Sequence, residues 1–120
     1  TTTNSITALV LSSTGTVGAT MEKNVLTEPA GWTAAAAAAA NVYVLHAIAQ
    51  AGVPGASATL DAATKFLAAN ALNNLTDNST TQTALSASGS VNMWYRLVMP
   101  TATTTQAART ITVRYTGTAQ

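Results

Sequence analysis

The chain has 120 residues, which suits one domain (1–120) with a single core, and 48% of them are hydrophobic, too many for a disordered chain. Charged residues make up only 8%, against roughly 25% in an average soluble domain, and the net charge is +1. This balance excludes the strong positive field with which proteins gather nucleic acid or anionic membranes. So weakly charged a surface favours burial in an assembly or cover by attached glycans.

The sequence favours a secreted protein. The chain has no cysteine, so disulfides do not stabilise it. No run of 18 apolar residues is present, so we expect no membrane span. The first residue is Thr1 rather than Met, as in a secreted protein whose signal peptide has been removed. We therefore expect an extracellular or cell-surface location.

The N-terminal residues 1–12 predict a β-strand with apolar side chains on both faces. Such a strand is either buried on both sides in its own domain or inserted into a neighbouring molecule, and both interpretations remain open. In the second, backbone hydrogen bonds complete the neighbour's sheet, and the head-to-tail contact builds a fibre because it does not close. Five apolar residues form the candidate exchanged strand: Ile6, Ala8, Leu9, Val10 and Leu11.

The middle of the chain, residues 33–76, predicts a helical insertion of two helices. The alanine run 34–40 has the highest helix propensity available, and Thr33 stands at the N-cap position. Residues 42–50 are ambiguous, because a helical stripe and a strand-like alternation coexist there, and we favour helix. Residues 59–74 predict the second helix from apolar residues at helical spacing.

The C-terminal residues 90–118 predict a β-hairpin around a threonine-rich turn. In its first strand, alternate residues from Val91 to Met99 are apolar, and Pro100 ends the strand. Residues 109–118 alternate in the same way. The expected fold is therefore mainly β with a helical insertion (α+β): a small jelly-roll-like sandwich with strands at both termini and two helices in the middle.

We find no set of residues that predicts catalysis, a cofactor or a metal ion. His46 is the only histidine, and no motif places an acid or a nucleophile beside it. The four acids are scattered along the chain: Glu22, Glu28, Asp61 and Asp77. Zinc and calcium sites need ligands at close spacing, which these acids lack. We expect no catalytic, metal or cofactor-binding residue, and therefore no enzyme.

Two tryptophans and two sequons remain as candidate contact sites. Trp32 and Trp94 are candidates for packing in the core, for sealing an interface or for stacking on sugar rings. So few aromatic residues favour the core, although Trp94 shares its predicted face with polar residues and is the better interface candidate. Asn74 and Asn78 begin N-x-[ST] tripeptides in a predicted polar loop, so each is either a glycosylation site or a chance match.

The C-terminal stretch "NMWYRLVMPTATTTQAARTITVRYTGTA" resembles the closing hairpin of secreted prokaryotic filament subunits, the TasA-like biofilm matrix proteins and the archaeal bundling pili and threads. The residues that carry the resemblance are Trp94, Pro100, 101–105 and 111–115. It implies a jelly roll with helical insertions whose subunits polymerise by donating the N-terminal strand, here residues 5–11.

The leading expectation is a structural subunit of an extracellular filament, such as a pilus, thread or biofilm matrix fibre. Its partner would be itself, in a head-to-tail homopolymer, with glycans as candidate additions. A virion coat or surface-layer subunit is the alternative, because a shell would also hide the low charge. A carbohydrate-binding module is the second alternative.

Overall fold

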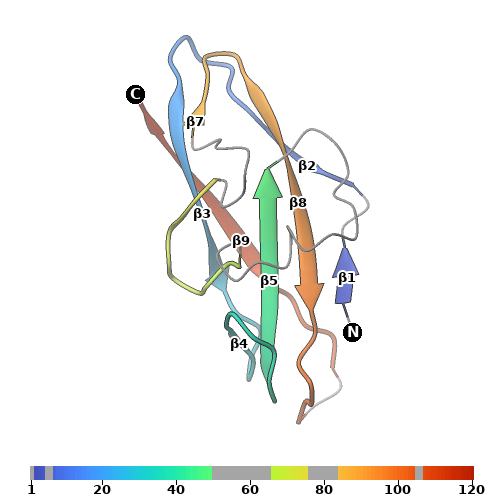
Figure 1. Cartoon of the computed structure of the whole chain (residues 1–120). Helices are drawn as coiled ribbons and strands as arrows, with labels where there is room; N and C mark the ends of the chain where they lie inside the picture. The colour runs from blue at the N-terminus through green and yellow to red at the C-terminus, as the bar shows by residue number, and fades with distance from the viewer. Residues whose placement is uncertain (1, 5–6, 50–65, 76–83, 105–106) are drawn as a thin grey trace.

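The computed structural model describes residues 2–4, 7–49, 66–75, 84–104 and 107–120. These residues contain nine strands in two sheets and no helix (Figure 1). The strands are β1 (Thr2–Asn4), β2 (Leu9–Ser12), β3 (Ala19–Thr27), β4 (Thr33–Ala34), β5 (Val42–Ala49), β6 (Asn73–Asn74), β7 (Ala84–Leu85), β8 (Ser90–Val98) and β9 (Thr112–Ala119).

The first sheet is built around β8. Strand β5 pairs with one edge of β8 in antiparallel orientation, and β1 and β2 share the other edge. The short strand β4 pairs in parallel with the beginning of β5. Beyond that point, Leu67 donates its backbone N–H to the carbonyl of Leu45 over 2.6 Å. Residues 66–69, the crossing segment, therefore lie along β5 and reach β3 through the bridge between Ala69 and Val25.

The second sheet is built around β3. Strand β9 pairs along nearly the whole of β3, from Ala19↔Ala119 to Thr27↔Thr112, with an irregularity between Val25 and Thr27. The other edge of β3 carries β6 and β7. Both terminal segments of the chain therefore pair with long strands, the N-terminal one in the first sheet and β9 in the second.

The core lies between the two sheets. Its buried side chains come from strands of both sheets and from the crossing segment: Met21, Val25, Trp32, Tyr43, Leu45, Ala47, Ala49, Leu67, Leu75, Leu85, Val91 and Met93. The hydroxyls of Tyr95 on β8 and Tyr115 on β9 form a hydrogen bond, which ties the two sheets together. The core is thus closed by apolar packing, and this hydrogen bond links the sheets beside it.

The predicted helix over residues 33–50 is wrong as far as the structure describes it, to residue 49, because Thr33–Ala34 form β4 and Val42–Ala49 form β5. Every residue from Tyr43 to Ala49 is buried, so β5 is covered on both faces. A strand covered on both faces has no polar side, so its pattern does not exclude a helix, and tertiary burial outweighs the high helix propensity of the preceding alanines. The alanine run turns back instead, and Asn41 donates its N–H to Ala102 O over 2.8 Å.

The second predicted helix is not seen where the structure describes the chain. Of residues 59–74, the part up to residue 65 lies outside the described residues. The rest contains isolated bridges, from Phe66 to His46 and from Ala69 to Val25, and then β6. The helical insertion is therefore absent from the described residues, and the fold there is mainly β rather than α+β.

The predicted C-terminal hairpin is also wrong in its pairing. Strands β8 and β9 both form, but β8 pairs with β5 whereas β9 pairs with β3 in the other sheet. Alternation along a strand tells which residues share a face, and it carries no information about the neighbouring strand. Residues 99–111 therefore connect the two sheets instead of closing a turn between paired strands.

The hydrogen bond between Tyr95 and Tyr115 gives a test of this two-sheet arrangement. We expect Tyr95→Phe and Tyr115→Phe each to lower the free energy of unfolding by about 1 kcal/mol. The double variant should lose less than the sum, because it removes both partners of one hydrogen bond. Tyr43→Phe is the matched control, since the buried Tyr43 hydroxyl has no hydrogen-bond partner. If urea titrations show that the two losses of unfolding free energy add up in the double variant, the hydrogen bond between Tyr95 and Tyr115 is contradicted.

Candidate functional site

The N-terminal segment lies on the edge of β8 and is the strongest candidate for a functional site (Figure 1). Strand β1 pairs with β8 from Thr2↔Val98 to Asn4↔Arg96. Strand β2 pairs from Leu9↔Met93 to Ser12↔Ser90. Ser13 then extends the contact, because its N–H donates to Gly89 O over 2.8 Å. Main-chain hydrogen bonds therefore hold this segment along most of β8.

The pairing is interrupted in its middle. Asn4 pairs with Arg96 and Leu9 pairs with Met93, so the register against β8 shifts by two residues between β1 and β2. A register shift of this kind interrupts the hydrogen-bond ladder. The predicted exchanged strand over residues 1–12 is therefore divided into two short strands, and Ile6 lies outside the described residues.

Few side chains anchor the N-terminal segment. Leu9 is 44% exposed and Val10 is 58% exposed, although β2 is paired along its length. Leu11 packs against the main core. Ala8 packs on the other face of the first sheet, against Ile48 and Trp94. The described part of the strand is thus held by its backbone and by two partly buried side chains.

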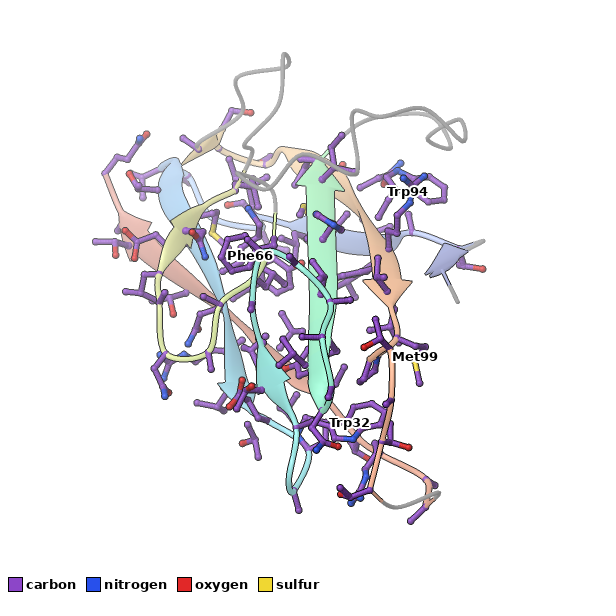
Figure 2. The ribbon with its side chains drawn as sticks, turned by 60° about the horizontal axis from the view of Figure 1, so that its bottom comes forward. Trp32, Phe66, Trp94 and Met99 are labelled. Atoms are coloured by element: carbon purple, nitrogen blue, oxygen red, sulfur yellow. The ribbon has the colours of Figure 1, made fainter. Side chains whose placement is uncertain are left out.

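The structure brings Trp94 together with the candidate exchanged strand. Trp94 is only 6% exposed and points away from the main core, where it packs with Ile48 and Ala8. Figure 2 shows it beside the N-terminal strands and far from Trp32. The sequence pattern indicates Trp94 as an interface candidate, but it gives no sign of the partner Ile48, because it favours a helix over the residues that form β5.

Trp32 lies at the other end of the molecule and is also buried (Figure 2). Its ring packs at a tilt on Tyr43, with centroids 6.3 Å apart. The guanidinium carbon of Arg109 lies 5.8 Å from the Trp32 ring centroid, a cation–π contact. Nearby, Glu28 Oε1 accepts a hydrogen bond from the Ala34 N–H over 2.6 Å. With these neighbours, Trp32 offers no open ring face on which a sugar could stack.

The other candidate residues are dispersed. His46 is buried on β5, opposite Arg96 in the register with β8. Glu22 lies on β3, and Asp61 and Asp77 lie outside the described residues. No cluster of three His, Cys, Asp or Glu residues in the described ranges is able to hold a metal ion. That same part of the chain has no helix whose length and apolar character would let it cross a bilayer.

The two sequons fall at the border of what the structure describes. Asn74 lies on β6, opposite Glu22 on β3, rather than in the polar loop predicted for it. Asn78 lies outside the described residues.

Comparison with known proteins gave no match: no family model, no curated protein and no solved structure is significantly similar to this chain.

The buried end around Trp32 and Tyr43 predicts a pH dependence. Burial, and secondarily the charge of Glu28, raises the pKa of Tyr43 to about 12 from 10.0. Because this pKa is higher in the folded state, ionisation of Tyr43 opposes folding. The stability that the fold has with a neutral Tyr43 hydroxyl is therefore present below pH 10, and part of it is lost between about pH 10 and 12.

Tyr43→Phe should therefore flatten part of the alkaline loss and leave stability at pH 7 unchanged or higher, because the hydroxyl has no hydrogen-bond partner. Burial also raises the pKa of Tyr95 and of Tyr115, so only the difference between the wild type and the variant isolates Tyr43. The measurement is the urea unfolding free energy at several pH values. Identical pH profiles for the two proteins would contradict the assignment.

Proposed function

We propose that the chain is a non-enzymatic structural subunit of an extracellular filament, and that copies join when the N-terminal segment of one chain pairs with β8 of the next. One observation carries this proposal. The segment pairs with β8 through seven residues of β1 and β2, yet among residues 7–12, whose side chains the structure describes, only Ala8 and Leu11 pack against a hydrophobic cluster.

A strand with few buried side chains detaches at a lower free energy than the core strands. Its departure leaves one edge of β8 with unpaired N–H and C=O groups, which is a template for an incoming strand. The strand of a second copy offers the same pairing and the same two anchors. The pairing that opens within one chain therefore forms again between two chains, which is the low-cost route known as domain swapping.

The connection that has to open is short. Residues 13–18 lead from β2 in the first sheet to β3 in the second. A Cβ at Gly18 would lie 2.8 Å from the carbonyl oxygen of Leu85, so this position requires glycine. Short links between two sheets favour exchange, because they hold the strand in a constrained path.

The surface composition supports an assembly. Several large apolar side chains are exposed, both on β2 and outside it: Leu9, Val10, Val17, Leu26 and Leu72. A surface with few charges and exposed apolar groups gains from contact with other copies. The burial of Trp32 and Trp94 removes the sugar-stacking surface that a carbohydrate-binding module would need. A coat or surface-layer subunit would use the same exchange in a closed or planar lattice.

Cysteine pairing gives the sharpest test, because the natural chain has no cysteine. Val10 and Asn92 are directly opposite in the register of β2 and β8, close enough for a disulfide. We expect a mixture of full-length Val10→Cys and Asn92→Cys chains to form disulfide-linked heterodimers under native oxidising conditions. Negative-stain electron microscopy of the wild type should show long uniform fibres.

Val17→Cys mixed with Asn92→Cys is the matched control, because Val17 is also exposed but lies outside the paired segment. The chain that carries both Val10→Cys and Asn92→Cys shows that the disulfide geometry is attainable. If that chain closes its own disulfide while the mixture yields no heterodimer, the N-terminal strand stays on its own chain and the proposal fails. Closed particles or flat lattices in the micrographs would favour the coat alternative.

A further inference from the structure

The contact of Ala8 with Trp94 is one of two places where the N-terminal segment, as far as the structure describes it, packs against a hydrophobic cluster; the other is Leu11 in the main core. Trp94 and Ile48 are both buried, and Ala8 is the residue of this segment that packs on them. Two positions further along the strand, Val10 is 58% exposed, so the space around the segment opens again. On this face of the segment, the apolar contact is therefore local to residue 8.

Leu11 and Ala8, the two side chains that anchor the segment, differ in the size of side chain that we expect each position to tolerate. Leu11 joins the main core, where apolar residues of similar volume are usually tolerated. Ala8 is partly buried and packs on Trp94 and Ile48, so we expect a larger side chain at residue 8 to press against one of these two. Overpacking of a buried contact is destabilising, because it forces side chains out of their preferred rotamers.

We infer that the size match between Ala8 and Trp94 determines which strand the β8 edge accepts, and that a second copy of this chain is the partner that satisfies it. Backbone pairing at an edge is independent of sequence, so it does not select a strand by itself. A limit on one side chain supplies that selection by excluding strands with a large residue at this position. The identity of the partner rests on the proposed function, whereas the size match does not.

The test enlarges one partner and reduces the other, in full-length chains. Ala8→Leu should weaken assembly by about tenfold or more, because the leucine meets Trp94. Trp94→Leu leaves a gap opposite Ala8 and should weaken assembly as well.

When Ala8→Leu and Trp94→Leu meet at one contact, the total volume of the two side chains is roughly conserved. A mixture of the two single variants should therefore assemble better than either variant alone, as measured by sedimentation and electron microscopy.

The mixture is informative because each junction in it is matched. The strand with Leu at position 8 fits the neighbour with Leu at position 94, and the strand with Ala8 fits the neighbour with Trp94. Ser12→Leu is the control, because Ser12 is exposed and lies on β2. It should leave assembly unchanged, which separates the local size limit from a general effect of added apolar surface. Thermal unfolding of every variant shows whether it is folded.

Two results separate this inference from the proposed function. If Ala8→Leu assembles and unfolds like the wild type, the size match is wrong, whether or not the wild type forms interchain disulfides. If Ala8→Leu is destabilised and the double variant within one chain recovers the lost melting temperature, the size match is right. If the double variant recovers its melting temperature but the mixture of single variants does not assemble, strand exchange between copies is overturned and the size match still holds.

Discussion

The structure depends on the backbone pairing of β8, which has a neighbour on each edge. Strand β5 occupies one edge and the N-terminal segment occupies the other. The two faces of β8 are also occupied, with Met93 in the main core and Trp94 in the smaller cluster on the opposite face. The two edges are not equivalent, however. The β5 edge belongs to a strand that is buried from Tyr43 to Ala49, whereas the other edge carries β2, whose residues are exposed except for the partly buried Leu11.

The surface of the folded chain carries even fewer charges than the composition suggests. Two of its five basic residues, Lys23 and Arg96, are buried. The Lys23 amino group lies within hydrogen-bond distance of Leu75 O, at 3.3 Å, and Arg114 is held at Asn24 by a 3.2 Å hydrogen bond. The surface therefore carries fewer charges than the sequence contains, and electrostatic repulsion between copies is weak. Hydroxyl groups and apolar side chains dominate what a second copy would meet.

The sequence predicted which residues share a face of a strand better than it predicted which strands pair or whether a segment is helix or strand. Alternation placed Val91, Met93 and Tyr95 on one face of β8, and these residues do pack in or against the main core. The same signal failed in residues 42–49, because a strand buried on both faces has no polar side and the preceding alanines favour helix locally. The pairing of β9 with β3 depends on contacts distant in sequence, which a local pattern does not contain. For the candidate site, the sequence identified Ala8 and Trp94 separately, and only the fold brings them into contact.

Strand exchange also has a thermodynamic property that follows from the geometry. The N-terminal segment would make the same contacts with β8 whether that strand belongs to its own chain or to another. Contact energies therefore cancel between the closed and the exchanged forms, and the balance depends on the link between β2 and β3 and on protein concentration. Residues 13–18 stabilise the closed form only as far as they prefer the bent path over an extended one. In the proposed exchange, a fibre would need no specialised adhesive surface, because the edge that holds the chain's own strand would be the binding site for the strand of the next copy.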